Sequence, residues 1–182
     1  MRAGKMPRRT GWLTLAAFVA TMASALPAAA PGTTERIAAR PQPWDRLIPA
    51  SKRFKPALDG TAVLDRETGL VWELAPDTAP ISWVAAPFVC LGKTVGGRKG
   101  WRLPAVEELM SLIEPAAAIP SLPPGHPFTG IQPDVYWTAT SVAGVAGEAY
   151  GVSLADGSLF DQPKSTLSRF WCVRGGFGHD GM

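Results

Sequence analysis

The chain has only two cysteines, Cys90 and Cys172, and their chemistry constrains the fold more than any other feature of the sequence. In an oxidising compartment an even number of cysteines predicts disulfides, and here it predicts a single one. A bond between residues so far apart would stabilise the folded state by about 4–5 kcal/mol on the chain-entropy model. The alternative is two buried free thiols, so the prediction depends on whether the protein is exported.

The first thirty residues predict export. Met1 to Arg9 is a positively charged region, and Trp12 to Leu26 is uncharged and apolar. This is the layout of a secretory signal peptide over residues 1–30, and the small residues near its end predict cleavage after Ala25 or Ala28. The apolar stretch is shorter than the roughly 20 residues that span a bilayer. We therefore expect a periplasmic or secreted bacterial protein, with no membrane span after cleavage.

The charge balance argues against a nucleic-acid-binding protein. The formal net charge is +3, but four of the 18 basic side chains lie in the predicted signal peptide, which has no acidic one. The remaining 14 basic side chains face 15 acidic ones, a net charge of −1 for the mature chain. A chain without net positive charge lacks the general attraction to phosphates on which nucleic-acid binding depends.

Side chains that usually carry catalysis or hold metals are scarce. The only histidines, His126 and His179, lie in a proline- and glycine-rich loop and in a glycine-rich tail. With both cysteines assigned to a disulfide, no Ser/His/Asp or Cys/His constellation and no typical zinc cluster remains. We expect no metal, no cofactor and no catalytic activity. Acid–base chemistry by carboxylates alone is the alternative.

Proline content and the distribution of apolar residues divide the mature chain into three parts. Residues 31–53 are rich in proline and have no sustained apolar period, which is typical of a linker. Residues 54–177 form a single domain, and residues 178–182 form a short polar tail. Because 46% of the chain is hydrophobic, it can bury a core, and wholesale disorder is excluded.

Turn signals and apolar periodicity indicate the elements of this domain. Thr61–Asp65 and Leu70–Leu74 alternate around a Glu-Thr-Gly turn, which predicts a β-hairpin. Trp83–Leu91 and Pro104–Ile113 have apolar residues at helical spacing, which predicts two helices. Pro87 should kink or shorten the first of them.

The second half of the domain predicts antiparallel strands. They are expected at Tyr136–Thr140, Ala149–Leu154, Ser158–Phe160 and Phe170–Arg174. Asp156 and Gly157 predict a hairpin turn, not a catalytic acid. Two helices, antiparallel strands and one disulfide define the predicted fold class, α+β.

Five short motifs follow one another along residues 54–176. They are Asp59-Gly60-Thr61-Ala62-Val63-Leu64-Asp65 with Thr68-Gly69-Leu70-Val71-Trp72; Gly100-Trp101-Arg102-Leu103-Pro104 with Glu107-Glu108-Leu109; Tyr136-Trp137-Thr138-Ala139-Thr140; Asp156-Gly157-Ser158; and Cys172-Val173-Arg174-Gly175-Gly176. In this order they resemble the Lcl C-terminal family (DUF1566).

The resemblance implies a C-type-lectin-like fold and an exported or surface protein. The family is named from a bacterial collagen-like adhesin whose domain binds sulfated glycosaminoglycans, and this chain lacks the Gly-x-y repeat of that adhesin. We therefore expect an exported, non-catalytic lectin-like binding or adhesion module for acidic glycans. The alternatives are an envelope structural domain or scaffold that contacts another protein and, least favoured, a periplasmic enzyme. The sequence assigns no oligomeric state.

Aromatic and charged residues within the motifs have structural interpretations. The five tryptophans of the predicted elements are expected in the core more than on a sugar-binding surface. They are Trp72, Trp83, Trp101, Trp137 and Trp171. Arg102 is expected to be a structural arginine that ties loop carbonyls or an acid such as Glu107 or Glu108, with ligand binding as the alternative.

One tripeptide raises the question of a calcium-dependent sugar site. Gln132-Pro133-Asp134 has the residues of the galactose-type tripeptide of calcium-dependent lectins. Calcium needs further oxygen ligands, and no Asn-Asp pair follows Trp137 or Trp171. The tripeptide is therefore interpreted as a proline turn before a strand.

A basic loop is the candidate ligand site. Lys93, Arg98 and Lys99 surround Gly96 and Gly97 in a segment without an apolar period. Backbone amides of flexible glycines and nearby cations favour sulfate or carboxylate groups. The alternative is an ordinary solvated loop.

A second basic cluster, Lys52-Arg53-Lys55, lies at the edge of the domain. At a mature charge near −1, any binding of a polyanion would be local and sensitive to salt.

Overall fold

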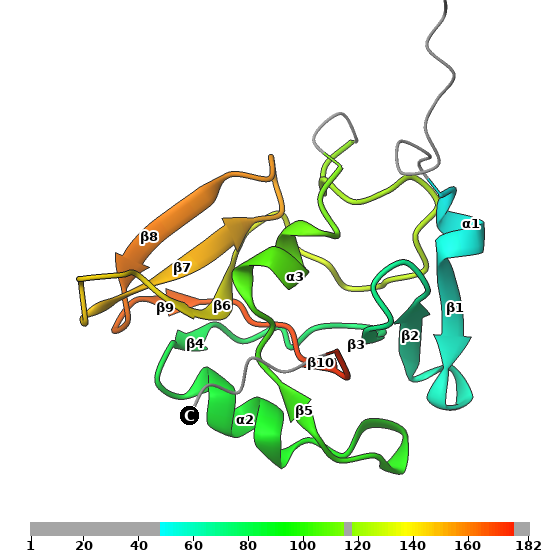
Figure 1. Ribbon diagram of the computed structural model, residues 1–182, viewed down its shortest axis with the longest axis horizontal. Coiled ribbons are helices and arrows are strands. Elements are labelled where there is room, and N and C mark those ends of the chain that lie inside the picture. The colour runs from blue at the N-terminus through cyan, green and yellow to red at the C-terminus, as the bar shows by residue number, and fades with distance from the viewer. Residues whose placement is uncertain (1–47, 115–117, 177–182) are drawn as a thin grey trace, which may run out of the picture. The chain divides into compact units, whose positions relative to one another are not determined.

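The computed structural model describes residues 48–114 and 118–176, all within the unit Pro41–Met182 (Figure 1). The predicted signal peptide, residues 31–47 of the predicted linker and the tail lie outside the described residues. The last part of the predicted linker is ordered, because Ala50–Arg53 forms the short helix α1. None of the helices in the described ranges is long and apolar enough to cross a membrane.

A five-stranded antiparallel sheet holds both ends of the domain, in the order β1-β2-β3-β10-β5. Its strands are β1 (Phe54–Ala57), β2 (Ala62–Asp65), β3 (Val71–Glu73), β5 (Trp101–Arg102) and β10 (Val173–Arg174). The predicted hairpin is confirmed as β2 and β3, with Val63 opposite Trp72. The last strand therefore lies between strands from the first half of the domain.

Two smaller sheets complete the strands. The three-stranded sheet has the order β6-β7-β8 and contains β6 (Val135–Ser141), β7 (Glu148–Ser153) and β8 (Leu159–Pro163). The other pairs β4 (Ile81–Ser82) with β9 (Leu167–Ser168). The predicted Asp156-Gly157 turn is confirmed between β7 and β8, where Asp156 Oδ1 accepts a hydrogen bond from the Ser158 N–H at 3.0 Å.

The last strand is shorter than predicted. The sequence predicts Phe170–Arg174, but only Val173 and Arg174 pair in the sheet. At Cys172 only half of the backbone pairing is made, because its carbonyl accepts the Glu73 N–H at 3.3 Å but its own N–H donates to the Glu73 side chain at 3.0 Å. A side chain thus replaces the backbone acceptor of this N–H.

Both predicted helices are present but shorter. The first, α2, spans Ala86–Gly92, and Pro87 lies in its first turn, where the missing N–H costs no hydrogen bond. The prediction that Pro87 should kink or shorten this helix is therefore confirmed, because the helix begins at Ala86 and not at Trp83. The second, α3, spans Val106–Met110, and Glu108 caps it by accepting the Ala105 N–H at 2.8 Å. The structure adds α1 to the two predicted helices.

The tryptophans lie in the core, as the sequence predicts. Trp72, Trp101, Trp137 and Trp171 are fully buried, whereas Trp83 is only partly buried. The Trp72 and Trp171 ring centroids are 5.2 Å apart. Four of the five indole N–H groups donate to backbone carbonyls, those of Trp83, Trp101, Trp137 and Trp171. The helices and antiparallel sheets confirm the mixed α+β fold class, and its tryptophans are shared between two hydrophobic clusters, with Trp72 and Trp171 in one and Trp101 and Trp137 in the other.

Three further motif residues are also inside the domain. Leu103, Pro104 and Tyr136 are buried. The Tyr136 hydroxyl accepts the Gln132 N–H at 3.0 Å, and burial raises the pKa of this phenol above 10.0. These residues therefore build the framework of the domain.

Candidate functional site

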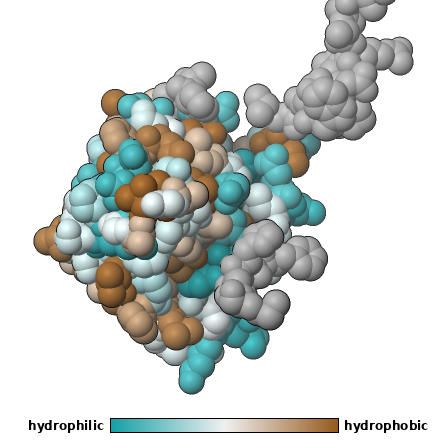
Figure 2. Space-filling model, turned by 60° about the vertical axis from the view of Figure 1, so that its left-hand side comes forward, coloured by the Kyte–Doolittle hydropathy of each residue, from teal (hydrophilic) through white to brown (hydrophobic). Residues whose placement is uncertain are grey.

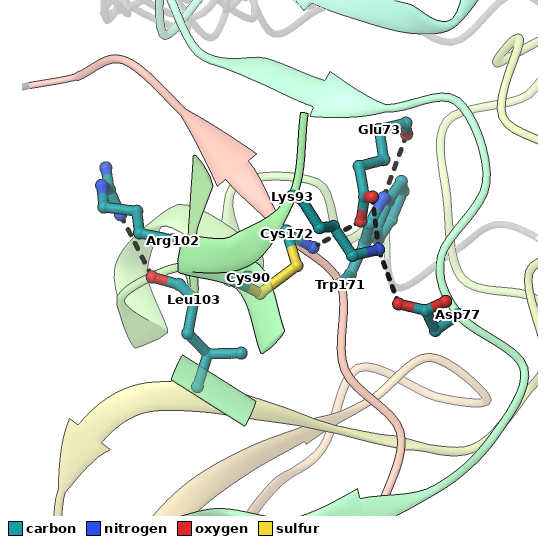
Figure 3. Close-up of a disulfide and its surroundings, with 8 residues drawn as sticks. All are labelled: Glu73, Asp77, Cys90, Lys93, Arg102, Leu103, Trp171 and Cys172. Atoms are coloured by element: carbon teal, nitrogen blue, oxygen red, sulfur yellow. Dashed lines mark hydrogen bonds and ion pairs between the residues drawn. A yellow bond between two sulfur atoms is a disulfide. The ribbon is translucent and has the colours of Figure 1, made fainter. Parts of the chain in front are cut away.

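The predicted disulfide is confirmed. Cys90 and Cys172 are bonded, with their Cα atoms 5.5 Å apart, and both are fully buried (Figure 3). Cys90 lies in α2 and Cys172 directly precedes β10. The bond therefore fastens α2 to the central sheet.

An ion-pair cluster lies beside the disulfide (Figure 3). Lys93 follows α2 directly, and its Nζ lies 2.5 Å from Glu73 Oε1 and 2.5 Å from Asp77 Oδ2. Glu73, on β3, is only 4% exposed. Its other oxygen, Oε2, accepts the Cys172 N–H. One carboxylate thus joins the end of α2 to the chain at the disulfide.

The proton affinities of this cluster follow from burial and pairing. Burial alone would lower the pKa of the Lys93 ammonium, but Asp77 and Glu73 outweigh it and hold the pKa above 10.5. Burial raises the pKa of Glu73 above 4.5, and the contacts with Lys93 and the Cys172 N–H offset this only in part. The cluster is a structural support, because its cation is already paired.

This pairing changes the predicted basic loop. Lys93 is turned inward with a side chain only 17% exposed, so it does not lie in an exposed loop beside Arg98 and Lys99 as predicted. Arg98 and Lys99 are exposed. A further cation lies close to them, since Arg174 Nε donates to the Lys99 carbonyl at 2.8 Å. Arg98, Lys99 and Arg174 are therefore the cationic group at this loop.

The residues of the second basic cluster, Lys52-Arg53-Lys55, also differ in exposure. Arg53 is buried, and its guanidinium binds Asp65 through two hydrogen bonds of 3.0 and 2.7 Å. It also lies 2.9 Å from Glu67. Lys52 and Lys55 remain exposed. Arg53 therefore anchors α1 to the β2–β3 hairpin and is not part of an anion site.

Arg102 makes the kind of contacts that the sequence predicts. Its guanidinium pairs with Glu108 through two hydrogen bonds of 2.7 and 2.6 Å. It also donates to the Gly175 carbonyl at 2.8 Å and to the Leu103 carbonyl at 3.3 Å. These contacts tie β5 to α3 and to the residues after β10.

An open cleft of about 1160 Å³ lies between α2, β5 and α3. Trp83, Pro87 and Leu91 line it from α2 and the turn before it, and Trp101 and Leu103 line it from β5 and the following residue. Three charged side chains also line it: Arg102, Glu107 and Glu108. The lining is mainly apolar, and Arg102 and Glu108 form the ion pair described above.

Large apolar side chains beside this cleft are exposed to solvent. Val84 is 58%, Phe88 71% and Leu91 68% exposed, and Val89 is exposed as well. We call these four residues the α2 apolar surface. Figure 2 shows some apolar side chains at the level at which α2 lies in Figure 1, and others over the upper part of the same face. A helix fastened by a disulfide thus presents apolar groups outward.

Local sequence patterns did not predict this surface. A sequence signal was available, because no side chain from Val84 to Gly92 is charged or carries a hydroxyl, amide or carboxyl group. An apolar run of this kind is normally assigned to the core, and periodicity cannot show that the opposite face of a short helix has no partner.

The described residues contain no cluster of metal-binding side chains. Within residues 48–114 and 118–176 no group of three or more His, Cys, Asp and Glu side chains could hold a metal ion. Asp134 of the Gln-Pro-Asp tripeptide pairs with Arg169 at 3.1 Å. His126 stacks against Phe128. His179 lies outside the described residues.

Comparison with protein families identifies the family of the chain. The sequence model of the Lcl C-terminal domain matches residues 61–174, more than half of the chain. The chain belongs to the Lcl C-terminal domain family. The match runs from the start of the β2–β3 hairpin to the end of β10, so it includes the disulfide, the Arg102–Glu108 pair and the cleft. No curated protein matches the chain.

Proposed function

We propose that this Lcl C-terminal domain is the non-catalytic binding module of an exported protein, and that the cleft and the α2 apolar surface bind another protein. The observation that carries the proposal is the exposure of Val84, Phe88, Val89 and Leu91 beside a mainly apolar cleft. Contiguous exposed apolar patches on soluble domains usually mark interaction sites. The proposal corresponds to the alternative of a scaffold domain that contacts another protein, and it assigns a surface to that contact.

The support beneath this surface favours binding. The Cys90–Cys172 bond fastens α2 from within, and Lys93 pairs with Glu73 directly after the helix. A helix held in this way loses little conformational freedom when a partner docks, so less free energy is spent on ordering. The arrangement therefore suits a preformed binding surface.

Export and the lectin-like architecture are parts of the same proposal. The layout of residues 1–30 is that of a signal peptide, and a buried disulfide fits an oxidising compartment. A C-type-lectin-like fold is supported by the small helices and by a last strand, β10, that returns to the first sheet. We propose a periplasmic or secreted location on these grounds.

Site-specific photo-crosslinking tests the surface. A benzophenone amino acid replaces Phe88 in cells that produce the protein, and the crosslinked partner is identified by mass spectrometry. The matched controls carry the same group at Leu159 on β8 or Leu167 on β9, which are also exposed apolar positions. We expect one protein to crosslink from position 88 and not from the controls. Equal crosslinking from all three positions would contradict the proposal.

Binding of an acidic glycan is the second candidate function. One observation favours it: Arg98, Lys99 and Arg174 lie together at the loop after α2. Exposed charge pairs contribute only about 0–1 kcal/mol each, so the three would have to act together. If the glycan binds at this group, a heparin column should retain the wild type at low salt. The variant with all three residues changed to alanine should not be retained. Lys93→Ala tests the original basic loop but also removes a buried ion pair.

A further inference from the structure

We propose that the partner segment of the cleft is an amphipathic peptide with large apolar side chains and a basic side chain that pairs with Glu107. This inference rests on the proposed function, because it assigns the chemistry of the ligand of the same site. It follows from the different character of the two sides of the cleft.

The side of the cleft formed by α2 is apolar. The helix α2 and the two residues before it, residues 84–92, contain no charged, hydroxyl or amide side chain, and the thiol of Cys90 is used in the disulfide. Phe88 and Leu91 are the most exposed side chains of the α2 apolar surface. Large apolar side chains of a partner would be the groups that gain most from burial here.

The second side of the cleft is acidic. Of its charged side chains, Arg102 and Glu108 form a two-hydrogen-bond pair with each other. Glu107, on α3, is exposed and makes no ion pair within residues 48–114 and 118–176. The charge that the described lining presents to a ligand is therefore negative.

Nearby cations do not reverse this charge. Lys164 lies over the Trp83 ring, 4.2 Å from its centroid, but it donates to the Ala146 carbonyl and does not line the cleft. Lys93 is paired with Glu73 and Asp77. A basic ligand group would compensate Glu107, whereas an acidic one would meet a like charge at short range.

The size of the cleft favours a peptide segment over a small molecule. Its volume of about 1160 Å³ exceeds the roughly 300–1,000 Å³ of ordinary small-molecule pockets. It is also continuous with exposed apolar side chains at Leu91 and the rest of α2. An amphipathic segment can place apolar side chains in a groove and keep its charged side chain at the rim.

Phage display tests the inference. Peptides that bind the folded, oxidised mature protein are selected from a random library. We expect the wild type to enrich peptides that combine aromatic or aliphatic residues with Lys or Arg. Glu107→Gln should keep the apolar preference and lose the basic one, and Glu107→Lys should change it to Asp or Glu. Asp161→Lys is the matched control, because Asp161 is exposed on β8, away from the cleft.

A synthetic copy of the most enriched peptide measures how much Glu107 contributes to the affinity. Its Kd should rise roughly fivefold to tenfold in Glu107→Lys and stay unchanged in Asp161→Lys, as expected for an exposed charge pair that becomes repulsive. An unchanged charge preference in both Glu107 variants would overturn the inference.

A further variant separates this failure from failure of the proposed function. Phe88→Ser with Leu91→Ser removes most of the α2 apolar surface and should abolish peptide binding without lowering Tm. If it does so while the Glu107 variants change nothing, the cleft is the binding surface and only the basic ligand group is wrong. If the wild type enriches no peptides, or the double variant binds them normally, both proposals fail.

Discussion

The carboxylate of Glu73 accepts the backbone N–H of Cys172 at 3.0 Å, so a side chain of β3 holds a half of the disulfide in place. The same carboxylate pairs with Lys93, which directly follows the helix that carries Cys90. Covalent and ionic links therefore join the same two segments. The candidate binding surface on α2 rests on both links.

Loss of the Glu73 carboxylate should destabilise the domain strongly. Glu73→Ala leaves the Cys172 N–H without its acceptor and Lys93 with Asp77 alone. Breaking a buried ion pair by removing one partner costs about 3–5 kcal/mol. We expect a loss of this size in the free energy of unfolding, measured by denaturant titration. Glu73→Gln, which keeps an acceptor oxygen, should lose less, and equal losses in the two variants would show that the hydrogen bond to Cys172 contributes little.

The Lys93 ion pairs should make the protein sensitive to high pH. Because the pKa of Lys93 is raised above 10.5 in the folded state, the folded protein holds this proton more tightly than the unfolded chain. Its contribution is complete below pH 10.5 and is lost as the pH rises through the folded-state pKa. Stability measured against pH in this range should fall less steeply in Lys93→Met than in the wild type. Lys99→Met, at an exposed position, should keep the wild-type slope.

Removal of the disulfide should weaken the whole domain, because it connects α2 to the central sheet. Cys172→Ser should lower the free energy of unfolding by about 2–5 kcal/mol, the range for native disulfides of small secreted domains. Denaturant titration of the oxidised wild type and the variant measures this difference. Two titratable thiols in the native, non-reduced protein would contradict the bond itself.

Alanine variants of two glycines with the same φ angle distinguish the cost of backbone strain from the cost of a steric clash. Gly157 and Gly144 both have φ of 78°, but a Cβ on Gly157 would lie 2.5 Å from Ile113 Cγ2, whereas one on Gly144 would meet nothing within 4 Å. Both alanine variants carry the strain of a positive φ. Gly157→Ala should also force Ile113 to move, at an additional cost of about 1–3 kcal/mol. Equal losses of Tm in the two variants would mean that Ile113 moves aside freely.

Local sequence patterns were sufficient for much of the framework. Alternation around a tight turn predicts the β2–β3 hairpin, and Asp156-Gly157 predicts the turn between β7 and β8. Short-range steric and hydrogen-bond preferences decide both, so the structure agrees with them. The cysteine pair had only one intramolecular partner for each sulfur, which made the disulfide predictable once export was inferred.

Contacts between distant residues decided what the sequence could not. Lys93 reads as an exposed loop cation, yet Glu73, twenty residues earlier, pairs with it inside the domain. Arg53 in the predicted linker is likewise buried against Asp65. Whether a charge is free or paired depends on which chain segments meet, and local periodicity contains no such information.

The candidate site shows the same division. The composition of residues 84–92 determined that α2 would be apolar, and the position of Cys90 determined which side of the helix the disulfide would fasten. Only the tertiary structure decided that Phe88 and Leu91 would remain exposed beside the cleft, with Glu107 on its other side. The physical reason is that burial is a property of the assembled surface: a side chain is covered only where another segment packs on it.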